Sequence, residues 1–235
     1  MEIRFPLILD GATGTELQKR GYTGESCAEQ WVLEHPETIR EVQRGYLDAG
    51  SRVVYAPTFG ANRQKLEERG IMNRTAEYNR RLAALSQEAA AGRAWVAGDI
   101  APTGLFLAPL GEASFEELVD IYTEQAAGLE EAGVDLYAIE TMMTLSDARA
   151  AVLAVRSVSD KPIFVSFTCD PTGRTLTGTD VAAALTVLQG MGVSAFGLNC
   201  SAGPAQMLPL LQRLREYARV PLLAKPNAGM PGGNG

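Results

Sequence analysis

Polar residues follow several short apolar runs of this sequence, and one of them is a carboxylate with an unusual setting. Glu140 comes directly after the apolar run Tyr137-Ala138-Ile139. A carboxylate at such a place is partly desolvated and needs a cationic partner. That partner is either the ammonium group of a ligand or an Arg or Lys of a neighbouring strand, and the sequence leaves both open.

A loop rich in glycine and small hydroxyl residues follows the first apolar run, and it reads Asp10-Gly11-Ala12-Thr13-Gly14-Thr15. Two glycines beside small residues let backbone N–H groups point into a cavity and hold an anion such as a carboxylate. The alternative is a plain turn in which Thr13 or Thr15 caps a helix. Composition alone does not separate these two interpretations.

The three cysteines, Cys27, Cys169 and Cys200, are too few for a disulfide framework, which favours a reduced, cytoplasmic protein. Cys200 stands apart because it follows the apolar run 195–199 and precedes a Gly-Pro helix start, a position that indicates chemistry. Cys27 and Cys169 are interpreted as small apolar residues. A single histidine, His35, excludes a His-based metal site and a Ser-His-Asp triad.

The apolar runs alternate with amphipathic stretches, which predicts a repeated strand–helix unit. Seven strands are expected, over residues 6–10, 52–56, 94–98, 135–139, 163–167, 195–199 and 221–225. Six helices are expected near residues 36–49, 74–91, 114–132, 145–157, 180–191 and 204–218. Ser114 is expected to cap the third of them, and Gly133 to follow its end. Continuous apolar strands are typical of a parallel sheet that is buried on both faces.

Two architectures fit this repeat, an open doubly wound sheet and a closed barrel. The open sheet usually carries Gly-x-Gly-x-x-Gly after its first strand, and the loop after Asp10 has the wrong spacing. Polar residues at the ends of almost every strand favour a barrel. We therefore predict an α/β fold, a (β/α)8 TIM barrel truncated after about seven strands, as a single domain over residues 1–235. Its open strand edges predict a homo-oligomer.

The bulk composition limits the partners. The net charge is −7 and no run is rich in lysine or arginine, which argues against nucleic acid and anionic membranes. We expect no secretory leader and no membrane span, because no apolar stretch approaches the ~20 residues that a bilayer requires.

Seven segments, in order along the chain, together resemble the homocysteine S-methyltransferase family. The likeness is closest to the homocysteine-binding N-terminal module of cobalamin-dependent methionine synthases. The segments are residues 10–15, 58–62, 98–104, 140–141, 173–178, 197–204 and 226–229. The resemblance implies zinc-dependent methyl transfer to homocysteine, giving methionine, with methylcobalamin on another domain or protein as the donor. It also implies that homocysteine contacts Asp10, Gly11, Ala12, Gly14, Thr15, Thr58, Glu140 and Asn199.

The implied zinc site is incomplete in this sequence. The resemblance makes Cys200 the first of three thiolate ligands, with the homocysteine sulfur in the fourth position. The family's other two ligands are an adjacent cysteine pair; no such pair occurs here, and Cys27 and Cys169 do not match those positions. One thiolate cannot make a tight zinc site. The chain is therefore expected to be a fragment of a longer enzyme, the alternative being a metal-free amino-acid-binding or assembly module.

A different barrel enzyme, such as an aldolase, is a third interpretation. It would need a strand-end lysine that forms a Schiff base. Lys225 is the candidate, although a surface or ion-paired lysine is the expected role.

Overall fold

A parallel sheet surrounded by helices makes up the protein, in a computed structural model that describes residues 5–200 and 202–228. Within these residues the sheet has six strands in the order β1-β2-β3-β4-β5-β6. They are β1 (Val53–Tyr55), β2 (Trp95–Ile100), β3 (Leu136–Met142), β4 (Ile163–Phe167), β5 (Ala195–Asn199) and β6 (Leu222–Lys225). The helices are α1 (Thr13–Gln18), α2 (Ala28–Glu34), α3 (Pro36–Asp48), α4 (Arg63–Glu67), α5 (Thr75–Ala90), α6 (Phe115–Glu131), α7 (Leu145–Val158), α8 (Val181–Gly190) and α9 (Pro204–Arg215).

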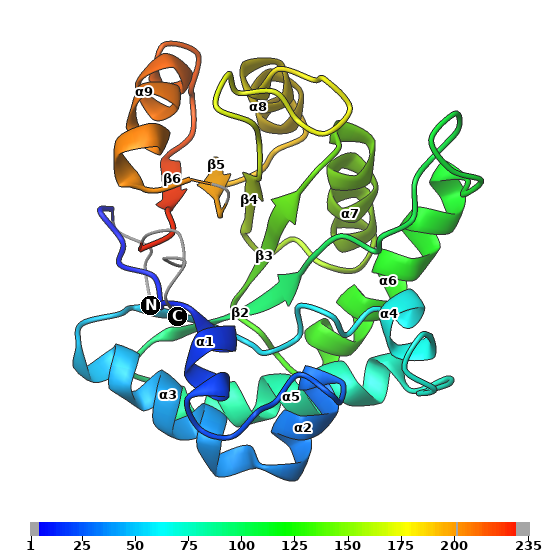
Figure 1. The fold of residues 1–235 in the computed structure, drawn as a ribbon, viewed down its shortest axis with the longest axis vertical. Helices are drawn as coiled ribbons and strands as arrows, with labels where there is room; N and C mark the ends of the chain where they lie inside the picture. Colours follow the sequence, from blue (N-terminus) through cyan, green and yellow to red (C-terminus); the bar gives the residue numbers. More distant parts are fainter. Residues whose placement is uncertain (1–4, 201, 229–235) are drawn as a thin grey trace.

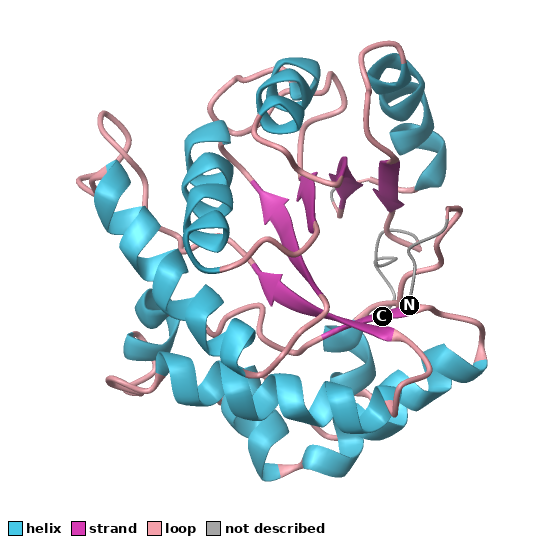
Figure 2. Cartoon of the chain, turned by 180° about the vertical axis from the view of Figure 1, so that it is seen from behind, coloured by secondary structure: helices cyan, strands magenta, loops and turns pink. Residues whose placement is uncertain are grey.

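The sheet curls on itself and the helices cover its outside (Figure 1). Every pair of neighbouring strands is parallel and consecutive along the chain. Seen from behind, the curl is open between the N-terminal segment and β6 (Figure 2). This arrangement confirms the predicted truncated barrel and rules out the doubly wound sheet, whose strand order would reverse.

The expected first strand, residues 6–10, is only partly formed. Leu9 makes a parallel bridge with Val53, and Arg52 N–H donates to Ile8 O at 2.8 Å. The pairing is short because Pro6 has no N–H to donate, while Tyr55 N–H donates to the Asp10 side chain instead of to a backbone carbonyl. The prediction of seven strands therefore becomes six strands and one bridged segment among the described residues.

The six predicted helices are present within a few residues of their expected ends. Ser114 was expected to cap α6, and it forms a full capping box with Glu117. Gly133, with a φ of 77°, follows the same helix as expected of a residue in the left-handed region. Helices α1, α2 and α4 were not predicted. They have five to seven residues each, too few to display a helical apolar period.

Side chains of the strands alternate between two apolar layers. The outer layer, between sheet and helices, takes Val54, Val96 and Ile139, and the inner layer takes Tyr55, Ala97 and other residues of the opposite parity. Both layers are buried, so the strands read as unbroken apolar runs. The alternation fixes which strand-end residues point into the barrel. Among the described residues, no helix is long and apolar enough to cross a membrane.

The crossing of α5 and α6 gives a test of this packing. A Cβ on Gly128 would lie 2.8 Å from both the Cα and the carbonyl oxygen of Ala76, and these backbone atoms cannot rotate away. We expect Gly128→Ala to lower the free energy of unfolding by about 1–3 kcal/mol in urea titrations.

Gly190→Ala is the matched control, because Gly190 ends α8 with nothing within 4 Å of a Cβ. It should be neutral or stabilising by up to about 1 kcal/mol. Equal effects of the two substitutions would contradict the assigned helix contact.

Candidate functional site

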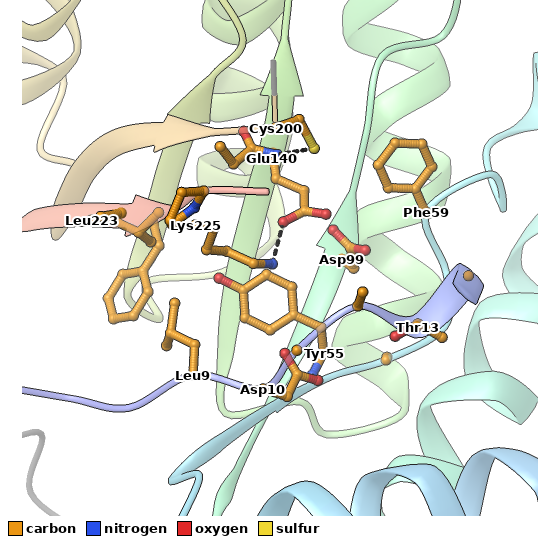
Figure 3. A pocket seen from close by; sticks show the side chains of 18 of the residues that line it. Leu9, Asp10, Thr13, Tyr55, Phe59, Asp99, Glu140, Cys200, Leu223 and Lys225 are labelled. Atoms are coloured by element: carbon orange, nitrogen blue, oxygen red, sulfur yellow. Dashed lines mark hydrogen bonds and ion pairs between the residues drawn. The ribbon is translucent and has the colours of Figure 1, made fainter. Parts of the chain in front are cut away.

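A cavity of about 1240 Å³ lies inside the curl and extends to the carboxyl ends of the strands. Its lining combines the N-terminal segment and the loop that follows it, residues of all six strands, and part of α2. The alternation of the strands places Tyr55, Asp99, Glu140 and Lys225 on the inner side, in register with the inner apolar layer. Figure 3 shows these side chains converging with Asp10; we call the five residues the floor cluster.

An ion pair lies at the centre of the floor cluster. Lys225 Nζ lies 2.6 Å from Glu140 Oε2, and it lies 3.7 Å from the centre of the Tyr55 ring, a cation–π contact. Lys225 belongs to β6 and Glu140 to β3, three strand spacings or about 14 Å apart in a flat sheet. The curl of the sheet and the length of both side chains close that separation.

Two further carboxylates of the floor cluster lack a full set of partners. Asp10 Oδ2 accepts from Tyr55 N–H at 2.8 Å, but Oδ1 of Asp10 and Oδ1 of Asp99 are buried without a partner within the described residues. Burial raises the pKa of Asp10 to about 7, against the lowering effects of the Lys225 ammonium and the Tyr55 N–H. Burial, reinforced by the Glu140 charge, raises the pKa of Asp99 well above its usual range.

The floor cluster is therefore short of positive charge. Burial lowers the pKa of Lys225, but the carboxylates of Glu140, Asp99 and Asp10 outweigh it and hold that pKa above its ordinary value. Lys225 is the one cationic side chain in the described lining. A fourth carboxylate of the lining, Glu29, accepts from Gly60 N–H at 2.7 Å and is already engaged. The arrangement suits a ligand that brings an ammonium group.

The ends of β3 and β5 are tied together by one amide. Thr141 N–H donates to Asn199 Oδ1 at 2.9 Å, and Asn199 Nδ2 donates to Thr141 Oγ1 at 2.7 Å and to Cys200 Sγ at 3.4 Å. Thr141 and Cys200 both have left-handed φ values, 60° and 55°, which cost energy unless neighbouring contacts hold them. Cys200 N–H donates to Lys225 O at 3.1 Å. Glu140, Cys200 and Lys225 thus share one hydrogen-bonded frame.

The loop after the N-terminal segment forms one wall of the cavity. A Cβ on Gly11 would lie 2.6 Å from the Tyr46 ring, so any other residue at this position would displace that ring. Tyr46 in turn donates to Ala12 O at 3.0 Å and fixes the loop from outside. The expected capping role of Thr13 or Thr15 is wrong, because the N-cap of α1 is Ala12, without a side-chain hydrogen bond, and both threonines lie within the helix. The loop does line the cavity, as the anion-binding interpretation requires.

Most residues that the resemblance selected lie in the lining. These are Asp10, Gly11, Ala12, Gly14, Thr15, Glu140, Asn199 and Cys200. Thr58 lies outside the lining: it is fully buried, and its hydroxyl donates to Asp99 O at 2.7 Å and accepts from Asp99 N–H at 3.2 Å. Thr58 therefore orders the end of β2.

Sequence reasoning did not select three members of the floor cluster, Asp99, Lys225 and Tyr55, as homocysteine-binding residues. Lys225 was expected to be a surface or ion-paired lysine. The structure gives Lys225 the ion pair with Glu140, so the cationic partner that Glu140 required is present on a strand. A buried, charged lysine is a poor Schiff-base nucleophile, which argues against the aldolase interpretation. Strand-end position and inner-face parity were the signals available for all three.

The described residues do not complete a metal site. No three His, Cys, Asp or Glu side chains are grouped so as to hold an ion in the part of the chain that the structure describes. Cys200 is exposed at the cavity, whereas Cys27 is buried and its thiol donates to Glu29 at 3.1 Å. Cys169 packs against the outer apolar layer. The residues present supply one thiolate, which does not fit a zinc centre.

The fold and the cavity define a protein of the α/β barrel class whose candidate site lies at the strand ends. A family model for homocysteine S-methyltransferase matches residues 7–235. The chain is 33% identical over 242 residues to the methionine synthases of Mycobacterium tuberculosis and Mycobacterium leprae, covering 96% of this chain and 20% of each relative. It thus spans about a fifth of the length of these relatives.

Solved structures agree with that match. The oxidized form of the homocysteine methyltransferase MmuM from Escherichia coli is 28% identical, with a TM-score of 0.86, covering 95% of this chain and 82% of that one. Its metallated form has the same TM-score of 0.86 at 27% identity, covering 95% and 84%. The chain belongs to the homocysteine S-methyltransferase family.

The raised pKa of Asp10 predicts a pH-dependent stability. The folded protein keeps the Asp10 proton up to about pH 7, while the unfolded chain releases it near pH 4. The contribution of neutral Asp10 is therefore full below pH 4 and is lost as the pH rises through 7. Relative to wild type, Asp10→Asn should gain about 1 kcal/mol or more in unfolding free energy between pH 5 and pH 7.5, measured by urea titration.

Asparagine keeps an acceptor for Tyr55 N–H, so the comparison isolates the charge. The groups that face Asp10, namely Lys225, Glu140 and Tyr46, are unchanged in the variant. Asp160→Asn, at an exposed position, is the control and should follow the pH profile of wild type. A constant difference between wild type and Asp10→Asn across this range would refute the assignment.

Proposed function

We propose that the chain binds homocysteine and presents its sulfur for methyl transfer, so that methionine is formed. The observation that carries this proposal is one cavity lined by the Asp10–Thr15 loop, the Glu140 carboxylate and the Cys200 thiol. The family match and the homocysteine methyltransferase MmuM support the same chemistry.

Each end of homocysteine has suitable partners in the cavity. The floor cluster, rich in carboxylates, suits the ammonium group, with Glu140 as its main partner and Asp10 nearby. Backbone N–H groups of residues 11–15, together with Lys225, suit the carboxylate. Asn199 supports these groups by holding Thr141 and Cys200, because its own amide is already bonded to Thr141.

In methyl transfer these residues need not form a covalent bond with the substrate. A sulfur–carbon bond forms as the bond between the methyl group and its donor breaks, and the thiol proton leaves to solvent. The chain holds the acceptor and excludes water from its charged end. We propose methylcobalamin, carried by another domain or protein, as the donor; the match to a fifth of each methionine synthase supports a partner domain.

We also propose that Cys200 is one ligand of a Zn²⁺ ion, which would favour the thiolate form of homocysteine when bound. The metallated form of MmuM shows that a relative of this chain takes a metal. The remaining ligands are absent from the residues described here, so the metal site needs side chains from elsewhere.

The competing proposal is a metal-free amino-acid-binding or assembly module. The lone thiolate at the cavity favours it. Self-association through the edge of β6 and the N-terminal segment stays a proposal, as does a cytoplasmic location, which three free cysteines support.

The first test is binding of L-homocysteine to the purified chain by titration calorimetry with a reductant present. Binding is expected, and Glu140→Gln should weaken it about tenfold or more, because an amide replaces the charged partner of the ammonium group. Glu130→Gln is the matched control: Glu130 pairs with Lys161 at 2.9 Å, away from the cavity lining, and its loss should leave the affinity unchanged. Equal affinity of wild type and Glu140→Gln would count against the proposed site.

The second test is the zinc content of the purified chain by elemental analysis, with and without homocysteine. The single cavity thiolate predicts well below one zinc per chain. A stoichiometric ion that disappears in Cys200→Ser, but not in Cys169→Ser, would contradict this expectation. It would mean that a second copy or an unassigned residue completes the site.

A further inference from the structure

The ion pair between Lys225 and Glu140 occupies the part of the cavity that the proposed function assigns to the charged end of the amino acid. Glu140 is the expected partner of the ligand ammonium, yet its Oε2 already lies 2.6 Å from Lys225 Nζ. The two side chains are only 20% and 13% exposed, so neither charge is well solvated on its own. A ligand that takes Glu140 must leave Lys225 with some other anion.

The surroundings of Lys225 offer few alternatives. The Tyr55 ring covers one side of the ammonium group at 3.7 Å, which stabilises a cation but does not neutralise it. Burial, reinforced by the Glu140 charge, raises the pKa of Asp99 well above its usual range and disfavours its anionic form, which makes Asp99 a poor second anion. Asp10 accepts from Tyr55 N–H through Oδ2 and forms no ion pair with Lys225 among the described residues, and burial raises its pKa to about 7. The carboxylate of the ligand is therefore the suitable replacement for Glu140.

We propose that Lys225 makes the cavity selective for a zwitterionic amino acid through an exchange of ion pairs. The ligand ammonium takes Glu140 from Lys225, and the ligand carboxylate takes the released Lys225 ammonium. Every charge then stays paired, whereas a ligand with only one of the two groups leaves a buried charge without a partner. This inference rests on the proposed function, because it assumes that homocysteine binds in this cavity.

The pairing of β5 with β6 fixes the backbone position of Lys225. Lys225 is paired with Asn199 in the strand register, and its carbonyl oxygen accepts from Cys200 N–H at 3.1 Å. The side chain lies on the inner side with Leu223, between the Tyr55 ring and Glu140 (Figure 3). Only the end of the side chain has to move in the exchange.

Three thiols of matched length test the exchange. They are L-homocysteine, 3-aminopropane-1-thiol, which lacks the carboxylate, and 4-mercaptobutyrate, which lacks the ammonium. Calorimetry on the wild-type chain should show homocysteine binding at least about tenfold more tightly than either analogue.

Each residue of the ion pair should weaken the binding of one analogue: Lys225 that of the amine, and Glu140 that of the carboxylate. Lys225→Met should bind 3-aminopropane-1-thiol about tenfold more tightly than wild type, because the amine no longer competes with a resident ammonium. Glu140→Gln should bind 4-mercaptobutyrate about tenfold more tightly than wild type, because Lys225 is then free for the carboxylate. Lys225→Arg should keep the wild-type preference for homocysteine. Lys161→Met and Glu130→Gln, which break a pair outside the lining, should change none of the three affinities.

Lys225→Met leaves buried carboxylates without their cation and can lose its fold, which circular dichroism would report. The double variant Glu140→Gln/Lys225→Met removes both charges, and it should fold and bind the three thiols with similar affinities. Equal losses for all three ligands in each single variant would overturn the exchange and leave the proposed function intact. Failure of wild type to bind homocysteine would overturn the proposed function and the exchange together.

Discussion

The balance of charge in the floor cluster is the constraint on which the rest of the site depends. Asp10, Asp99 and Glu140 share one ammonium group, that of Lys225, in a space shielded from water. Unpaired carboxylates in such a space cost free energy, and the raised pKa values of Asp10 and Asp99 express that cost. The two apolar layers of the sheet must offset it. The protein therefore keeps, at its centre, a deficit of positive charge that a ligand can relieve.

The curl of the parallel sheet brings the charged side chains of the floor cluster together. The alternation of side chains turns Asp99, Glu140 and Lys225 to the same inner side, and the curl brings β3 and β6 face to face. The Asn199 amide then joins β5 to β3, and a backbone hydrogen bond joins Cys200 to Lys225. A shift of any one of these strand ends would disturb the others. Under the proposed function, one frame would therefore position both the charged end and the sulfur end of the ligand.

Much of the architecture could be predicted from the sequence, because it depends on local patterns. Apolar runs at regular intervals located six strands, and the Ser114 cap and Gly133 located the ends of α6. The strand-end rule located Glu140 and Cys200. The pairing of Glu140 with Lys225 could not be predicted, since it depends on how far the sheet curls. The direction of the Thr58 hydroxyl could not be predicted for a related reason: whether a loop hydroxyl faces the cavity or the neighbouring strand is decided by tertiary packing.

The two ends of the site differ in how complete they are, and the proposed function explains the difference. The charged end has carboxylates, an ammonium group and backbone amides that all come from the described residues. The proposed sulfur end has one exposed thiol, contacted by Asn199 and held in a left-handed conformation that costs energy. The strained conformation of Cys200 would be explained if its thiol has to face a group from outside the described cavity, such as the proposed zinc ion. Under the proposed function, recognition of the amino acid and activation of its sulfur are separate tasks, and the described residues supply groups that suit the first of them.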